Sequence, residues 1–464
     1  MRIVLGLTCI TLVLAYVQKS PCANGDWVGS KQYTHACYSD VIPLWSAERL
    51  DVGNVPYRDN GVEYPVLVGA FMWLSGGLTQ AVHTVLSSVS DVQLFGLLTC
   101  LLLAGCALAT AAGTVGAAGR RPYDATIFAL SPLVVIHAFS NWDLLAMALA
   151  SCGLWAWARE RPVAAGALLG LGMTAKLYPI LLLLPIILLA IRTRKYRPAA
   201  WCVAAAVVAW LTVNVPLGLA YYSGWREFYA FSATRDAEAS TVWYMGHYLR
   251  TVGFGPGSAV GWEPPGLAVA CFFLAGIAAV SGLGLLAPIK PRIGQLAFLT
   301  VLAFLLTTKV WSPQYSVWLV PLVALARPRW RLSLLWQFSE IAVWIATLLW
   351  LLSFTDPNHG LTYGWLMVFL IIRDLVLCAL AVEVIREIWY PELDAVRAHP
   401  LDDPAGGPYD GAPDFSPEIR RERLNYASVT GSLAIEWSTS DDTDPAPEPA
   451  PRASTGSDRP ETER

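Results

Sequence analysis

The chain has 464 residues, of which 55% are hydrophobic and 14% are charged, and its formal net charge is -3. Average soluble domains carry about 25% charged residues, so this composition argues against an ordinary soluble domain and favours an all-α polytopic membrane protein. The basic residues stand in short connections rather than in one stripe, which argues against a nucleic-acid partner.

The first apolar segment covers residues 3–18, directly after Arg2. A cleaved signal peptide is one interpretation of it, but no clear A-x-A site follows, so we expect a retained first helix. Cys22 and Cys37 lie in the polar stretch beyond it. They can form a disulfide if that stretch faces an oxidising compartment.

Further apolar segments follow at 92–117, 123–139, 142–158, 162–175, 176–192, 198–218, 265–287, 293–308, 313–326, 332–353 and 363–386. With the first segment they predict about twelve transmembrane helices. Alternate connections carry the basic residues Arg2, Arg120, Arg121, Arg159, Arg161, Lys290, Arg292 and the runs at 192–197 and 327–331. Because cytoplasmic loops accumulate Lys and Arg, we expect these connections, and both termini, to face the cytoplasm.

Residues 65–82 are also apolar enough to span, but a span there would invert every later basic loop. We therefore expect them to lie in the outer surface of the cell membrane. A first outer loop then covers 19–91, and a second large outer loop covers 219–262. From residue 390 the chain is rich in Pro, Asp, Glu, Ser and Gly, which predicts a membrane domain over 1–389 and a disordered cytoplasmic tail over 390–464.

Ionisable groups beside membrane spans are costly and tend to be functional. The expected outer connections hold six of interest, namely Asp40, Glu63, Asp143, Lys176, Arg235 and Lys309. Each also has a structural interpretation. The two aspartates can cap helices, the lysines can extend to the interface, and Glu63 and Arg235 can be ordinary solvated loop residues. Arg373 and Asp374, inside the last span, are expected to pair structurally.

Several motifs carry a resemblance to a known family. They are "SD" at 39–40, "ERLDVGNVPYRDNGVEYPVLVG" at 48–69, "NWD" at 141–143, "AKLYPILLLLP" at 175–185 and "SPQYSVWLVP" at 312–321. In this order they resemble the integral-membrane GT-C glycosyltransferases, and most of all glycosyltransferase family 87. One departure is "YPVL", where many members have "YPPL".

The resemblance implies an inverting transfer from a polyprenyl-phosphate-linked sugar to a hydroxyl of a cell-envelope glycolipid or polysaccharide outside the membrane. Mannose is the favoured sugar and arabinofuranose the alternative. Asp40 is the expected general base, and Lys176, Lys309 and Arg235 are the expected phosphate ligands. The sugar or the acceptor is expected to meet Glu63, Tyr64, Trp142, Asp143 and Gln314. No metal or other cofactor is expected.

Three other classes of protein stay open at this point. A lipid-linked sugar flippase or other transporter predicts charges at the membrane midplane and internal symmetry. A protein O-mannosyltransferase predicts paired acids at the start of the first loop, where this chain has Asp40 followed by Val41. A scaffold or channel subunit explains neither the long outer loops nor their acidic and basic residues.

Overall fold

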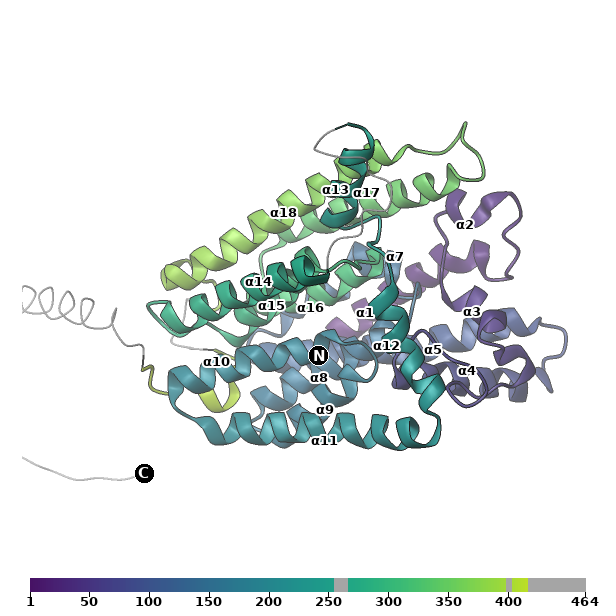
Figure 1. The fold of residues 1–464 in the computed structure, drawn as a ribbon. Coiled ribbons are helices and arrows are strands. Elements are labelled where there is room, and N and C mark those ends of the chain that lie inside the picture. Colours follow the sequence, from purple (N-terminus) through teal and green to yellow (C-terminus); the bar gives the residue numbers. More distant parts are fainter. Residues whose placement is uncertain (254–265, 398–402, 416–464) are drawn as a thin grey trace, which may run out of the picture. The chain divides into compact units, whose positions relative to one another are not determined.

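The computed structural model describes residues 1–253, 266–397 and 403–415, which belong to one unit, Met1–Ser416. In this part of the chain the regular elements are all helices, and β-strands are absent (Figure 1). The expectation for 416–464, the larger part of the predicted tail, lies outside the described residues.

The first half of the unit holds the helices α1 (Arg2–Lys19), α2 (Lys31–Thr34), α3 (Val41–Ala47), α4 (Val66–His83), α5 (Asp91–Ala118), α6 (Thr126–Ala129), α7 (Pro132–His137), α8 (Asp143–Ala158), α9 (Pro162–Met173) and α10 (Leu183–Thr193). The second half holds α11 (Tyr196–Ala220), α12 (Tyr222–Thr234), α13 (Val242–Thr251), α14 (Gly266–Leu286), α15 (Ile293–Thr307), α16 (Leu319–Ala326), α17 (Trp330–Leu352) and α18 (Tyr363–Trp389). Short 3-10 helices are η1 (Ser20–Cys22), η2 (Val28–Ser30), η3 (Leu50–Val52), η4 (Pro122–Ala125), η5 (Tyr178–Leu182), η6 (Pro313–Trp318), η7 (Pro391–Leu393) and η8 (Gly407–Tyr409).

Six of the described helical segments are long and apolar enough to cross a membrane, and they are Arg2–Cys22, Val66–His83, Asp91–Ala118, Tyr196–Ala220, Gly266–Leu286 and Trp330–Leu352. Five shorter apolar helices accompany them. The predicted class, an all-α polytopic membrane protein, is thereby confirmed. By length and composition α4 belongs to the spanning set, and its expected place along the membrane surface stays a prediction.

One expected span is not a single helix. Residues 123–139 form three short pieces, η4, α6 and α7, instead of one continuous segment. The break comes at Ser131 and Pro132, where Ser131 is extended and its hydroxyl accepts from the backbone N–H of Val134. Proline fits the first turn of a helix but not its interior, so Pro132 starts a new helix there.

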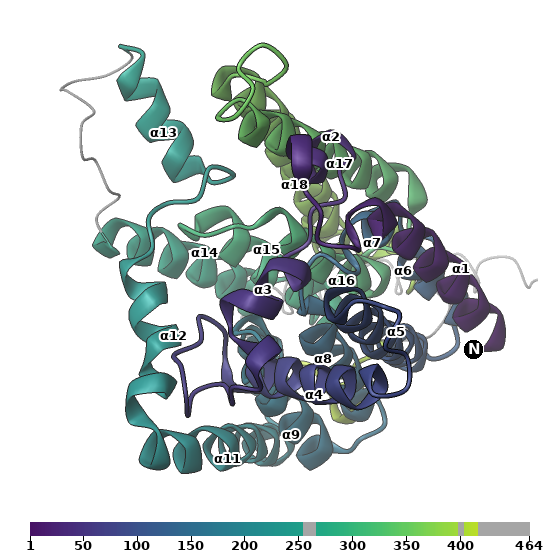
Figure 2. The same ribbon diagram turned by 90° about the vertical axis from the view of Figure 1, so that its right-hand side faces the viewer.

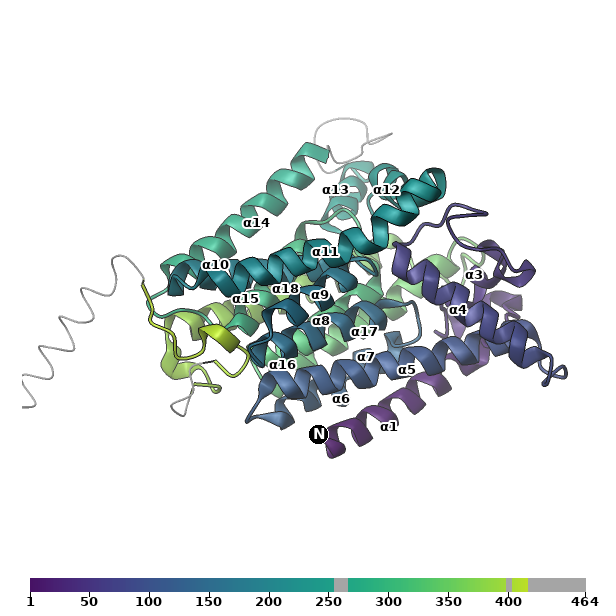
Figure 3. The same cartoon turned by 90° about the horizontal axis from the view of Figure 1, so that it is seen from below.

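Close backbone contacts bring together the helices that support the cavity described below. α8 packs against both α5 and α9, and α9 packs against α11. A β-carbon at Gly166 or Gly170 of α9 would collide with the backbone of Cys202 or Ala206 in α11. This Gly-x-x-x-Gly spacing allows two helices to approach where lipid offers no hydrophobic driving force. Figure 3 shows α1 beside α5, and Figure 1 shows α17 beside α18.

The connections between helices gather at two ends of this unit. Figure 2 faces the end that carries α3, α4, α12 and α13, which come from the two predicted outer loops. Tyr57 joins the two loops, because its ring packs on Gly69 of α4 and its carbonyl meets Gly224 of α12. The short helix η8 lies at the other end, beside α8 and α10 (Figure 1).

Residues 391–397 and 403–415, which follow the predicted boundary at residue 389, pack on the basic connections. Asp394 is fully buried and pairs with Arg292 at 2.7 Å, and Asp414 pairs with Arg192 at 2.6 Å. The indole N–H of Trp157 also donates to the carbonyl of Gly406. These ion pairs and this hydrogen bond to the backbone keep the segment in place even though its apolar content is low.

Candidate active site

A cavity of about 610 Å³ is lined by residues next to α3 and α4, on α12 and in the connection from α12 to α13. Its wall includes most of the predicted site residues, namely Asp40, Glu63, Tyr64, Lys176, Arg235, Lys309 and Gln314. These residues come from four connections that are far apart in the sequence. The fold therefore gathers the acids and bases of the expected outer loops around one space.

Asp40 stands directly before α3, and two donors hold its carboxylate. The Tyr38 hydroxyl donates to Oδ1 at 2.8 Å, and Nδ2 of Asn141 donates to Oδ2 at 2.7 Å. The carboxylate makes no capping bond to α3, so the capping interpretation is wrong. Burial raises the pKa of Asp40 above its ordinary value, although both hydrogen bonds and the charge of Lys176 oppose the shift.

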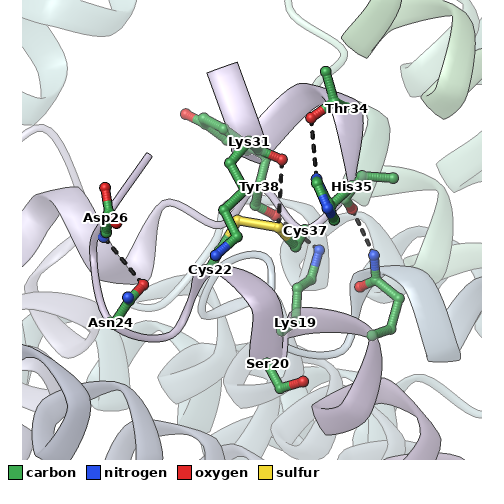
Figure 4. Close-up of a disulfide and its surroundings, with 12 residues drawn as sticks. Lys19, Ser20, Cys22, Asn24, Asp26, Lys31, Thr34, His35, Cys37 and Tyr38 are labelled. Carbon is green, nitrogen blue, oxygen red and sulfur yellow. Dashed lines mark hydrogen bonds between the residues drawn. A yellow bond between two sulfur atoms is a disulfide. The ribbon is translucent and has the colours of Figure 1, made fainter. Parts of the chain in front are cut away.

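The segment before Asp40 is tied down by covalent and polar contacts (Figure 4). Cys22 and Cys37 form a disulfide, as the sequence allowed. The Lys19 ammonium, at the end of α1, donates to the carbonyl of Tyr38 at 2.8 Å. Together with the bond from the Asp40 N–H to the Ser140 carbonyl, these contacts fix where Asp40 lies.

Lys176 lies between α9 and η5, and 7% of its surface is exposed. Its ammonium lies 3.6 Å from Asp143, 5.2 Å from the ring centre of Tyr64 and 5.1 Å from that of Tyr315. Burial by itself lowers the pKa of Lys176, but Asp143 and the other anionic groups outweigh it, so its pKa is raised. The side chain therefore holds a charged ammonium at the cavity wall, which contradicts the interpretation that it extends to the interface.

Two predicted site residues lie behind the wall instead of on it. Trp142 is fully buried with its ring edge toward Tyr64, and Asp143 is 2% exposed. Asp143 accepts from the Trp318 indole at 2.8 Å while it faces Lys176. Their expected contact with sugar or acceptor stays a prediction, and in this structure they contact Tyr64 and Lys176 from behind the wall.

Asn141, the first residue of the motif "NWD", is a site residue to which the sequence alone assigned no role. Its Nδ2 donates to both Asp40 and the Tyr64 hydroxyl, at 2.7 and 3.0 Å. Its Oδ1 accepts from the N–H of Trp142. Only the first residue of this motif reaches the cavity, because it precedes α8 and the next two begin that helix.

A second cluster joins the α12–α13 connection to the segment after α15. Arg235 pairs with Glu238 at 2.6 Å, and the Ser312 hydroxyl donates to the same oxygen, Oε1, at 2.7 Å. The Lys309 ammonium donates to the carbonyl of Ala233 at 3.1 Å. Burial raises the pKa of Glu238, against the opposing effects of Arg235 and Ser312. The sequence reading missed Glu238, which stands three residues after Arg235.

The remaining predicted residues, Glu63 and Gln314, also line the cavity. Glu63 is exposed at the cavity, and burial of part of its carboxyl raises its pKa despite the charges of Arg235 and Lys176. Gln314 lies at the start of η6 and is 8% exposed. A further part of the wall is apolar, and it comprises Phe228, Phe231, Phe304, Leu348 and Leu351. Within residues 1–253, 266–397 and 403–415 no three His, Cys, Asp or Glu side chains gather as metal ligands, so we assign none.

Comparison with known families identifies the chain. The sequence profile of glycosyltransferase family 87 matches residues 63–313, which is more than half of the chain. The chain belongs to glycosyltransferase family 87. The predicted family and enzyme class, a membrane glycosyltransferase that uses a polyprenyl-phosphate-linked sugar, are thereby confirmed. Asp40 lies before the matched range, so its role must be argued from geometry.

Two further comparisons were made. A search of curated proteins found no match. Among solved structures, the chain is similar to the crystal structure of ArnT from Cupriavidus metallidurans bound to undecaprenyl phosphate, with 14% sequence identity and a TM-score of 0.43. That alignment covers 82% of this chain and 76% of ArnT.

Proposed function

We propose that this family 87 enzyme transfers a sugar, preferably mannose, from a polyprenyl-phosphate carrier to a hydroxyl of a cell-envelope glycolipid or polysaccharide. The transfer inverts the anomeric configuration and takes place at the outer face of the cell membrane. The observation that carries the proposal is the cavity itself, which holds a doubly hydrogen-bonded carboxylate, Asp40, together with the cations Lys176, Arg235 and Lys309.

Asp40 is the proposed general base. A hydroxyl is a weak nucleophile, so its proton must leave as its oxygen attacks the anomeric carbon. Two donors keep the carboxylate oriented, and burial keeps its affinity for a proton above that of an ordinary aspartate. The base is therefore both fixed in place and able to accept a proton.

The three cations are the proposed ligands of the phosphate. As the bond from the anomeric carbon to the phosphate oxygen breaks, negative charge grows on the leaving polyprenyl phosphate, and fixed positive groups stabilise it. Lys176 acts as a point charge held between two rings, whereas the Arg235 guanidinium can fork onto two oxygens. The apolar part of the wall suits the first units of a prenyl chain.

Two observations support an outer-face location for the cavity. The disulfide between Cys22 and Cys37 stands near Asp40, and disulfides persist in oxidising compartments. The basic connections that contain Arg121, Arg192 and Arg292 gather around residues 391–397 and 403–415, away from the cavity. Cytoplasmic connections are the ones that accumulate such residues.

The test is transfer of labelled mannose from polyprenyl-phosphate-mannose to octyl α-mannoside by the purified protein in nanodiscs. Wild-type protein is expected to form a disaccharide, and Asp40→Asn should form at least about a hundredfold less, since general bases contribute about that much. Lys176→Ala should raise the KM for the donor in folded protein. Wild-type rates in Asp40→Asn would refute the assignment of the base.

The same assay tests the other interpretations. Replacing the donor by polyprenyl-phosphate-arabinofuranose distinguishes the two sugars, because the preferred donor gives the larger kcat/KM. A flippase would move the labelled lipid between leaflets without forming a disaccharide. A faster flip with no glycosidic product would overturn the proposed transfer reaction.

A further inference from the structure

The α17 side of the cavity contains hydrogen-bonding groups that the proposed chemistry does not use. Trp344 and Thr347 line the cavity and stand one turn apart on α17. The Trp344 indole N–H and the Thr347 hydroxyl have no hydrogen-bond partner in the part of the chain that the structure describes. Trp344 is 4% exposed, so its N–H is buried at the cavity wall.

Buried polar groups without partners are rare in native structures, because each one costs about 1–3 kcal/mol of lost hydration. Thr347 is also unusual among the helical threonines of this protein. The hydroxyls of Thr193 and Thr300 donate to carbonyls four residues earlier, as is common in helices. The Thr347 hydroxyl makes no such bond in the described structure and is available to a ligand.

Glu238 adds an acceptor to the same cavity. Its Oε1 accepts hydrogen bonds from both Arg235 and Ser312, whereas its Oε2 is buried and has no hydrogen-bond partner among the described residues. The neighbouring Ala239 packs against a hydrophobic cluster that contains Val343 and Ala346 of α17. An N–H, a hydroxyl and a carboxylate oxygen match a ligand that both donates and accepts hydrogen bonds.

Trp344 lies on the side of the general base. The ring of Tyr38 lies 6.3 Å from that of Trp344, and the Tyr38 hydroxyl donates to Asp40. Inversion requires the attacking hydroxyl to stand beside Asp40 and to approach the anomeric carbon from the face opposite the phosphate. The α17 groups are therefore placed to hold the molecule that is attacking.

We infer that Trp344 and Thr347 form the subsite for the acceptor sugar, which they recognise through the hydroxyls next to the one that attacks. The inference rests on the proposed function and specifies it: the acceptor presents a polyhydroxylated, uncharged sugar ring to α17.

The experiment compares acceptor and donor affinity in the full-length protein in nanodiscs. Trp344→Phe and Thr347→Val each remove one hydrogen-bonding group while they preserve most of the volume. The probe is octyl α-mannoside, measured both as its KM in the transfer assay and as saturable binding of the tritiated compound without donor. Each variant should raise the acceptor KM and Kd about fivefold, the loss typical of one hydrogen bond, and leave the donor KM unchanged.

Two controls make the result specific. Thr300→Val is the matched control, because it makes the same replacement at a helical threonine that does not line the cavity, and it should leave both constants unchanged. Lys309→Ala should raise the donor KM and leave acceptor binding as it is. An unchanged acceptor Kd in both α17 variants overturns the inference, as does an effect on the donor KM alone, which would assign these groups to the donor sugar.

The two proposals fail in different ways. If the wild-type protein binds octyl α-mannoside and Thr347→Val weakens that binding, but no disaccharide forms, the subsite stands and the proposed transfer fails. If the wild-type protein forms a disaccharide without saturable dependence on octyl α-mannoside, the transfer stands and the subsite fails. Because Thr347 is only partly buried, Thr347→Val gives a folded variant even if Trp344→Phe does not.

Discussion

The replacement Tyr38→Phe is the cleanest test of the environment of Asp40. It removes one oxygen atom, the hydroxyl that donates to Oδ1 of Asp40 at 2.8 Å, and it keeps the ring that lies near Tyr33 and Trp344. The other donor, Asn141, remains at 2.7 Å from Oδ2. The change therefore alters the proton affinity of the base more than its position.

The direction and size of the effect follow from the hydrogen bond. A donor that binds the ionised carboxylate lowers the pKa, so its loss raises the pKa of Asp40 further above the ordinary value. A hydrogen bond to a charged group contributes about 1.5 kcal/mol at the low end, which is roughly a tenfold change in proton affinity. Because a general base acts when ionised, the rising acid limb of the pH–rate profile should move to higher pH.

The assay is kcat/KM for sugar transfer as a function of pH. At a pH on the acid limb, Tyr38→Phe should be about tenfold slower than the wild type, while the plateau at higher pH should change much less. Tyr33→Phe removes a nearby hydroxyl that has no bond to Asp40 and should reproduce the wild-type profile. A lower plateau with an unmoved acid limb would refute this reasoning and would make Tyr38 a residue that positions substrate.

Three further outcomes are expected. Asp143→Asn removes the charge that raises the pKa of Lys176 against the effect of burial, so the ammonium should lose its proton at lower pH. The donor KM should then rise as pH increases, and a KM that does not depend on pH would contradict this. Asp394→Asn leaves Arg292 buried without a counter-charge and should lower the free energy of unfolding by about 3 kcal/mol, measured by thermal or denaturant unfolding in detergent; a change below about 1 kcal/mol would contradict the structural role. Cys37→Ala removes the disulfide beside the segment that carries Asp40, so kcat and the melting temperature should both fall, and dithiothreitol should have the same effect on the wild type. A variant as active and as stable as the wild type would show that the other contacts are sufficient to hold this segment.

Local sequence was enough to predict the long apolar helices, although the expected span 123–139 forms shorter pieces. The expected span at 198–218 corresponds to α11, Tyr196–Ala220, and the expected span at 332–353 corresponds to α17, Trp330–Leu352. The reason is that a bilayer requires long apolar helices, so the length and the composition of a segment together indicate its structure. The alternation of basic connections likewise predicted which loops would meet, because a chain that crosses a membrane returns to the same side at every second connection.

Tertiary structure alone decided which polar side chains reach the cavity and which support it. Within "NWD", Asn141 contacts Asp40, whereas Trp142 and Asp143 point into the protein, since the start of α8 orients the three side chains differently. Glu238 is likewise placed by tertiary structure, because it accepts a hydrogen bond from Ser312, which is distant in the sequence.

The residues after α18 illustrate the same limit. Their low apolar content predicted disorder, yet Asp394 and Asp414 pair with Arg292 and Arg192, which lie in other connections. Composition is a property of a short segment, and it measures how much apolar surface that segment can bury by itself. The partners of a charged side chain are set by the packing of the whole chain. The sequence by itself therefore determined the long apolar helices and the alternation of basic and non-basic connections between them, whereas the tertiary structure determined which residues form the site.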